Sequence, residues 1–433
     1  MTATQQVFDQ LRRFESRNVT FLDPDGSWPV VWDRAAGTQV WDLEGKEYLD
    51  LTAAFGVAAA GHANPRVVAA GQAQMGRLLH AMGDVHPHSL KAQLAARLSG
   101  ITFGRWSQTE GKTVFCNSGF EAVEVALKTA MLATGRRGVL AFSGGYHGLG
   151  YGTLNATSRS LFRDPFVSQL GGFGESLPFP ASEAELEETM TQVECCLATR
   201  TIGAVLLEPI QARGGIRIPP SSFLKRLRTT CDQYGTLLIV DEIYTGFGRT
   251  GSWFACEHSA VVPDLICLGK ALTGGFPLSA CVGRAELMDS AWPESQGEAI
   301  HTSTFLGHPV GCAMALAQIQ ELTTGNLVQE SARKGQTTLE ALKSLAHELD
   351  NPRWTLSARG RGLMLGLEIT LADGQPGTAM SLAIIKDLLH AGFILLPEGS
   401  AAEVISLTPP LTIDEKDLKR TVQSLGNQLR RYL

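Results

Sequence analysis

The chain has 433 residues, of which 44% are hydrophobic and 18% are charged, with a formal net charge of −6. This composition is typical of a globular protein with a large core, and the length allows about two or three domain-sized units. The acidic balance excludes the basic footprint of a nucleic-acid-binding protein, and no stretch approaches the roughly 20 apolar residues of a membrane-spanning helix.

The N-terminal residues and the cysteines both indicate a cytoplasmic protein. Residues 1–16 lack the apolar core of a secretory signal, and Val7, Leu11 and Phe14 have the spacing of an amphipathic helix. The 8 cysteines are scattered and form no C-x-x-C pair. We therefore expect reduced thiols, not a disulfide framework or a zinc site.

Residues 31–51 alternate apolar and polar side chains around two turn signals, which predicts a β-meander. Short apolar runs then alternate with helical stretches as far as about residue 320, a pattern typical of a largely parallel α/β sheet. The predicted strands cover residues 114–116, 139–142, 204–207, 237–240, 265–268 and 278–282, and the predicted helices include 120–134, 183–198 and 220–234.

Beyond residue 320 the pattern changes to α+β. Helices are predicted at 313–322 and around 335–349, and strands at 362–369, 393–396 and 404–407. We expect three units: residues 1–55, which pack with the small domain; a large α/β domain at 56–320; and a small α+β domain at 321–433.

Polar residues follow several of the predicted strands directly. Ser118, Glu208, Asp241 and Lys270 each lie at or just beyond the C-terminal end of an apolar run. Parallel strands end at the same edge of a sheet, and ligands of open α/β sheets bind at that edge. These four side chains are therefore expected to meet in one site.

Lys270 and Asp241 together suit pyridoxal-phosphate (PLP) chemistry. An amine forms a Schiff base with the cofactor's aldehyde, while a carboxylate keeps the pyridine nitrogen protonated. The helix after Ser118 and Gly119 begins with free backbone N–H groups that suit a phosphate. Tyr146 could stack on a flat ring or be an ordinary core residue, and His147 could support the site or simply occupy a turn.

The motifs that follow one another along the chain resemble those of class III PLP-dependent aminotransferases of fold type I. The resemblance extends over nearly the whole length and includes the ornithine, acetylornithine, 4-aminobutyrate and omega-amino acid enzymes and glutamate-1-semialdehyde aminomutase. The residues that carry it are the VWD…G…YLDL meander, Gly61 and His62, NSGFEAVE, YHG, EPIQ, DEIYTGFGRTG, GKAL, HTSTFLGHP and TPPL, in that order.

The resemblance implies a role for each matched residue. Lys270 would hold the cofactor and shuttle a proton, and Asp241 would pair with the pyridinium nitrogen. The phosphate would be held by Ser118, Gly119 and the Phe120 backbone, and the cofactor ring would lie between Tyr146 and Ile243, near Glu208 and Tyr244. Ser303 and Thr304 would reach the phosphate of the partner subunit, which implies a homodimer with shared active sites.

The chain departs from its relatives in the substrate pocket. Relatives that act on α-amino acids often carry an arginine before the PPL motif, whereas this chain has Ser406 there. Glu208 is thereby expected to find another donor or to be protonated, because a buried unpaired carboxylate is costly. Arg163, or failing that Arg159, could bind a substrate carboxylate instead, although a surface arginine is an equal alternative.

Three further residues concern the shape of the pocket. Tyr244 replaces a glutamine or an apolar residue, and its hydroxyl could bond the cofactor or its ring could fill space. Trp28 and Phe55 are expected as pocket walls by their position. Together they favour a substrate with an apolar or extended side chain.

Three functions compete at this point. The first is an aminotransferase that moves an amino group from an amino acid or omega-amine to an oxo acid or aldehyde. The second is an isomerase on the same scaffold, either a racemase or epimerase or an aminomutase, since the same lysine can return a proton to either face of Cα. A noncatalytic cofactor-binding module is disfavoured because Lys270 and Asp241 are both present, and metal catalysis because His86 and His88 lack further ligands.

Overall fold

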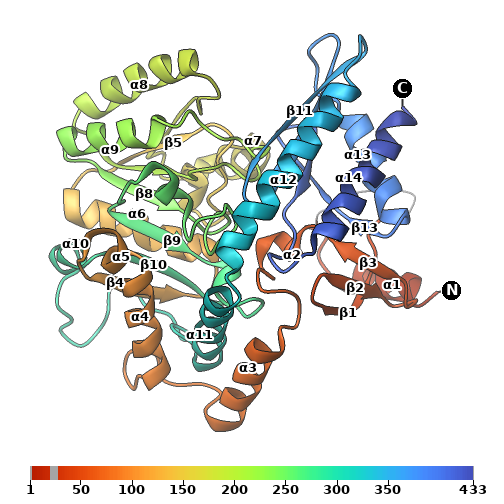
Figure 1. Ribbon diagram of the computed structural model, residues 1–433. Coiled ribbons are helices and arrows are strands. Elements are labelled where there is room, and N and C mark those ends of the chain that lie inside the picture. The colour runs from red at the N-terminus through yellow and green to blue at the C-terminus, as the bar shows by residue number, and fades with distance from the viewer. Residues whose placement is uncertain (1, 20–27, 433) are drawn as a thin grey trace.

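The computed structural model describes residues 2–19 and 28–432 and centres on one large twisted sheet (Figure 1). The strand order in this sheet is β4-β10-β9-β8-β7-β5-β6, and only β10 runs antiparallel to its neighbours among the described strands. The strands are β4 (Gly111–Cys116), β5 (Gly138–Phe142), β6 (Gly174–Leu177), β7 (Ile202–Leu207), β8 (Leu237–Asp241), β9 (Leu265–Leu268) and β10 (Ser279–Arg284).

The predicted largely parallel α/β sheet is confirmed, and each strand predicted within it is present. The sequence gives no signal for β6, because this short edge strand is only partly buried and has no apolar run. Its backbone pairs in parallel with β5 and extends the sheet by one strand.

Apolar residues on both faces of the strands explain why the sheet is covered on both sides. In β8, Ile239 packs into a cluster with α6 (Gly119–Thr134), whereas Leu238 and Val240 pack into the cluster of α8 (Glu183–Ala198) and α9 (Phe223–Tyr234). Neighbouring residues of a strand point to opposite faces, so a continuous apolar run serves two helical layers.

The two ends of the chain share a smaller sheet, in the order β1-β2-β3-β13. The predicted meander forms β1 (Trp32–Ala36), β2 (Gln39–Asp42) and β3 (Glu47–Asp50), and β3 pairs in parallel with β13 (Phe393–Ile394). A third sheet, β11-β12-β15-β14, contains β11 (Trp354–Arg361), β12 (Met364–Leu371), β14 (Leu396–Glu398) and β15 (Val404–Leu407). The pairing of β3 with β13 favours the expected association of residues 1–55 with the C-terminal unit. The domain boundaries at 55 and 320 stay a prediction.

The remaining helices connect these sheets and cover them. They are α1 (Ala3–Phe14), α2 (Ala53–Gly56), α3 (Pro65–Arg77), α4 (Ser89–Ile101), α5 (Phe103–Ser107), α7 (Ser160–Arg163), α10 (Ala285–Ala291), α11 (Pro309–Thr324), α12 (Leu327–Glu348), α13 (Thr378–His390) and α14 (Glu415–Arg430), with 3₁₀ turns η1 (Thr153–Asn155), η2 (Asp164–Gln169), η3 (Ala255–Ser259) and η4 (Lys270–Leu272). The predicted N-terminal helix is present as α1, but Leu11 and Phe14 are exposed.

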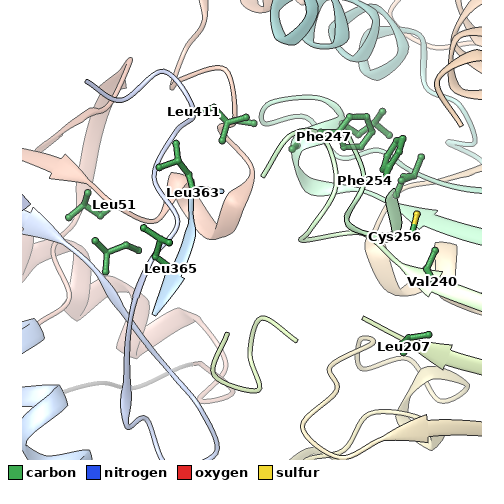
Figure 2. Close-up of a cluster of buried hydrophobic side chains, with 14 of the residues drawn as sticks. Leu51, Leu207, Val240, Phe247, Phe254, Cys256, Leu363, Leu365 and Leu411 are labelled. Carbon is green, nitrogen blue, oxygen red and sulfur yellow. The ribbon is translucent and has the colours of Figure 1, made fainter. Parts of the chain in front are cut away.

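A buried junction connects the loop after β8 with the C-terminal part of the chain. Figure 2 shows Phe247 and Phe254 on the large-sheet side and Leu363 and Leu411 on the other, all members of one hydrophobic cluster. The Arg249 guanidinium lies in this junction and donates hydrogen bonds to the carbonyls of Leu363 and Pro409. The loop that begins at Asp241 is thereby anchored to residues far along the sequence.

The structure also shows the state of the cysteines and the character of the helices. All 8 cysteines are free thiols, as expected. Within the described ranges, no helix combines the length and the apolar character that crossing a membrane requires.

Candidate active site

A cavity of about 360 Å³ lies at the edge of the large sheet where β7, β8 and β9 end. Most of the residues predicted to form the site contribute to its wall. The lining residues are Gly119, Phe120, Tyr146, His147, Gly148, Leu149, Glu208, Arg213, Asp241, Ile243, Tyr244 and Lys270.

Lys270 enters this cavity from the turn that follows β9. Its backbone has φ 44°, a left-handed conformation that is unusual for a residue with a side chain. Its Nζ lies 3.8 Å from the centre of the Tyr244 ring. Burial lowers the pKa of the Lys270 amine to about 8, although the nearby carboxylates of Glu208 and Asp241 oppose this effect. A substantial fraction of the amine is therefore neutral, and so nucleophilic, near pH 8.

Asp241 ends β8 and is held by two hydrogen bonds. The Oδ1 atom accepts the backbone N–H of Ile243 at 3.1 Å, and Oδ2 lies 2.8 Å from His147 Nδ1. A carboxylate only accepts hydrogen bonds, so Nδ1 carries the hydrogen in this pair. The other ring nitrogen of His147, Nε2, is buried and has no partner among the described residues. His147 thus orients the carboxylate, which is the supporting role that the sequence left open.

Glu208 follows β7, at the sheet edge where the sequence placed it, and it is buried. Its Oε2 accepts the backbone N–H of Tyr146 at 3.0 Å, and its Oε1 accepts that of Ala212 at 3.3 Å. Burial raises the pKa of Glu208 to about 7, and the negative charge of Asp241 adds to this. The expectation that Glu208 finds other donors or is protonated in the absence of an arginine at position 406 is confirmed. The Ser406 hydroxyl itself donates to the Leu396 carbonyl at 2.9 Å.

The start of α6 forms one wall of the cavity. Gly119 packs so closely on Ile243 that an added Cβ would lie 3.0 Å from the Ile243 Cδ1 atom. The Ser118 hydroxyl donates to the Glu121 carboxylate at 3.0 Å, and this carboxylate also accepts the backbone N–H groups of Asn117 and Ser118. Gly119 and Phe120 line the cavity, whereas the Ser118 hydroxyl is bonded to Glu121 beside the cavity wall.

Two aromatic side chains contribute further walls. Tyr146 packs edge-on against Phe162, with ring centres 5.9 Å apart, and the Arg213 guanidinium lies 5.0 Å from the Tyr146 ring. The Tyr244 hydroxyl lies 3.2 Å from the Thr408 hydroxyl, and its ring lies beneath Lys270. Of the two roles considered for Tyr244, this arrangement favours the ring as a packing surface.

Six predicted residues are not among the described residues that line the cavity. Ser118 lies beside the wall, and the other five are Trp28, Phe55, Arg163, Ser303 and Thr304. Trp28 is buried in the main hydrophobic cluster, Phe55 is exposed, and Arg163 ends the short helix α7. Ser303 and Thr304 are exposed, and the Ser303 hydroxyl accepts a hydrogen bond from the Asn117 amide at 3.4 Å.

Sequence reasoning missed one cation of the cavity wall. Arg213 lies in the loop after β7, and its guanidinium lies 3.9 Å from the carboxylate of Glu398, at the end of β14. The available signal was a charged residue within the glycine-rich segment QARGG, directly after the EPIQ motif. Nothing in that segment indicates Glu398 as the counter-ion, because it comes from the C-terminal unit.

Solved structures of amino-group-transferring enzymes match this chain over nearly its whole length. An amine transaminase from an uncultivated Pseudomonas species, in its PLP-bound form, is 29% identical, with 97% of this chain and 98% of that chain covered and a TM-score of 0.87. An (S)-enantioselective omega-transaminase from Thermomicrobium roseum is 26% identical, covers 100% and 99%, and has a TM-score of 0.90. The ornithine aminotransferase of Toxoplasma gondii is 26% identical, covers 100% and 96%, and has a TM-score of 0.86.

The fold and the cavity define a fold type I PLP-dependent enzyme. The family model of class-III aminotransferases matches residues 22–429, so the chain belongs to the class-III aminotransferase family. The residues present fit the cofactor of this family, because a buried amine of lowered pKa and an oriented carboxylate face one cavity beside two aromatic rings. The family and its PLP dependence, both expected from the sequence, are confirmed.

Proposed function

We propose that this class-III aminotransferase moves an amino group from an amino acid or omega-amine to an oxo acid or aldehyde, with Lys270 as the catalytic residue. The observation that carries the proposal is that Lys270 and the His147-bound carboxylate of Asp241 face the same cavity. When bound, PLP supplies an electron sink that stabilises negative charge at the substrate carbon. The protein's own part is to bind, orient and move protons.

The cavity walls suggest how the cofactor is held. Lys270 would attach the cofactor through its amine, and Asp241 would hold a proton on the ring nitrogen, supported by His147. Gly119 and the Phe120 N–H, with Ser118 beside them, would hold the phosphate. Tyr146 and Ile243 would contact the two ring faces, while Glu208 and Tyr244 would border the ring edge.

Lys270 would also carry the proton that transamination moves. When not joined to the cofactor, its amine would be a base near the substrate carbon, and its lowered pKa leaves a large neutral fraction at mildly alkaline pH. A base with a pKa near the working pH is efficient in both directions of proton transfer. The nearby Tyr244 ring, 3.8 Å from Nζ, would guide the amine across the cavity.

We further propose a homodimer that shares its active sites. Ser303 and Thr304 are exposed, and neither is among the described residues that line the cavity of Lys270. Exposed apolar residues lie close to them in sequence, including Ile300 and Phe305. Burial of this surface by a second copy would bring the two hydroxyls to the partner's phosphate site. The free thiols support the proposal that the enzyme works in the cytoplasm.

A visible spectrum of the PLP-loaded protein tests the activity. Addition of an amine without an acceptor should bleach the visible band and release an aldehyde or ketone. A band that persists while solvent deuterium enters the substrate's Cα would instead support the isomerase. Lys270→Ala should lose the visible band, and a variant that keeps more than about one per cent of the rate would contradict the role of Lys270.

A further inference from the structure

Arg213 is a cation of the cavity wall that the cofactor roles above leave unused. Its guanidinium lies over the Tyr146 ring, 5.0 Å from the ring centre, and its side chain is 35% exposed. Arginine presents a planar set of donors that matches a carboxylate. The guanidinium is therefore charged, accessible and positioned beside the ring that we assign to the cofactor.

The counter-ion of Arg213 is held only loosely. The Nε atom lies 3.9 Å from Glu398 Oε2, which is beyond hydrogen-bond distance. Glu398 is 5% exposed, and no hydrogen bond to its carboxylate is present within residues 2–19 and 28–432. Burial raises the pKa of Glu398 to about 7, although the charges of Arg213, Lys270 and Arg159 oppose this. A carboxylate that forms direct hydrogen bonds with the guanidinium could thus displace Glu398 from Arg213.

Hydrogen bonds hold the backbone of Arg213 in place, whereas its guanidinium has only the distant Glu398 carboxylate as an ion-pair partner. Its carbonyl accepts a hydrogen bond from Arg159 Nη2 at 2.9 Å and another from the Gly399 N–H at 3.2 Å. These bonds tie the loop of Arg213 to the residue that follows Glu398. The two charged side chains therefore remain neighbours, whichever ligand Arg213 binds.

We propose that Arg213 binds the carboxylate of the substrate and that Glu398 is the internal counter-ion which this carboxylate replaces. The inference rests on the proposed function and specifies its substrate class: amine donors and carbonyl acceptors that carry a carboxylate. Simple amines enter the same site and leave Arg213 paired with Glu398. Because the exchange involves only two side chains, one site can serve both classes.

The other arginines considered for this task are placed less well. Arg159 Nη2 is occupied by the carbonyls of Arg213 and Gly399. Arg163 ends α7 and is not among the described residues that line the cavity. Ser406 carries no charge. Arg213 is consequently the arginine that can meet a substrate beside Lys270.

Calorimetric titration of the PLP-loaded protein tests the inference without turnover. The probes are propionate and glutarate, with uncharged glutaramide as the neutral control. We expect the carboxylates to bind and Arg213→Gln to weaken them by about tenfold or more, the usual effect of losing a charged hydrogen bond. Arg213→Lys should recover part of the affinity. Arg217→Gln, on the same loop but outside the cavity wall, should change nothing.

Glu398→Gln should change the carboxylate affinity in the opposite direction to Arg213→Gln, and a folding defect would not produce such an increase. Removal of the competing charge should strengthen carboxylate binding severalfold, and in steady state it should lower KM for a carboxylate-bearing amine more than for 1-phenylethylamine. Equal glutarate affinity in wild type and Arg213→Gln, or no binding of either carboxylate by wild type, would overturn the inference. Weakening by Arg163→Ala in place of Arg213→Gln would overturn it as well. Failure of the proposed function is distinct: it would appear as a protein without a visible cofactor band or without transfer from any amine.

Discussion

The Nδ1 atom of His147 lies 2.8 Å from the Oδ2 atom of Asp241, and both side chains are almost completely buried. The hydrogen bond joins the segment after β5 to the end of β8, so residues from two strand ends fix the orientation of the Asp241 carboxylate. The second oxygen of Asp241 is held by the Ile243 N–H. Both oxygens thus have fixed partners, and the carboxylate has a single orientation at the cavity wall.

Replacement of His147 tests whether this orientation matters. His147→Ala should lower kcat by about ten- to a hundredfold, a range typical for loss of a residue that orients a catalytic group. His147→Asn should recover part of the rate, because its amide can donate to Asp241. The pH dependence of the cofactor's absorption should shift in the alanine variant alone. Wild-type spectra and rates in His147→Ala would show that Asp241 needs no such support.

The lowered pKa of Lys270 predicts how the apoprotein takes up its cofactor. Only the neutral amine is a nucleophile, so the capture rate should rise by about tenfold per pH unit and level off above about pH 8. The positive charge of Arg213 contributes to the lowered pKa and the negative charge of Glu398 opposes it. Arg213→Gln should therefore move the midpoint to higher pH and Glu398→Gln to lower pH. Stopped-flow absorbance measures both, and a midpoint that neither variant moves would contradict this coupling.

The position of the site at the sheet edge was predictable, because polar residues directly after apolar runs must meet where parallel strands end. Lys270, Asp241 and Glu208 were accessible to this reasoning. The pairing of Arg213 with Glu398 was not, because it depends on how the loop after β7 meets the end of β14, and Gly399 bonds the Arg213 carbonyl only in the folded protein. The proposed role of Ser303 at the phosphate of a second subunit could not be read from the packing of a single chain, because the proposed contact lies between two copies.

The raised pKa of Glu398 predicts a pH-dependent effect on stability. Its folded pKa of about 7 exceeds the ordinary value of 4.5, so the favourable contribution is complete below about pH 4.5 and is lost as pH rises through 7. Arg213, Arg159 and Lys270 are the charged groups that act on this carboxylate. Glu398→Gln should raise the free energy of unfolding at pH 8 by at most about 3 kcal/mol and leave it unchanged near pH 4.5. Thermal melts at the two pH values measure the difference, and equal gains at both would contradict it.

The proposed dimer interface can be tested through an exposed ring. Phe305 is 53% exposed and directly follows Thr304. Phe305→Asp should shift the mass measured by light scattering from about two chains toward one, because a charge would be buried without a partner. The same variant should bind PLP more weakly if Ser303 and Thr304 serve the neighbouring site. Leu371→Asp, at an apolar residue 38% exposed at the end of β12, is the control and should remain dimeric. A wild-type protein whose measured mass corresponds to one chain would contradict the proposed active sites shared between two subunits.

Two helical glycines give a matched test of packing between α12 and the loop before β12. An added Cβ at Gly335 would lie 2.0 Å from the carbonyl oxygen of Gly362, and backbone atoms cannot move aside as a flexible side chain can. Gly100 in α4 has nothing within 4 Å of its added Cβ. Gly335→Ala should therefore lower the free energy of unfolding by about 2–4 kcal/mol through overpacking. Gly100→Ala should raise it by up to about 1 kcal/mol through helix propensity. Urea denaturation measures both values, and changes of the same sign would show that α12 can move away from the loop and that its close contact is not required.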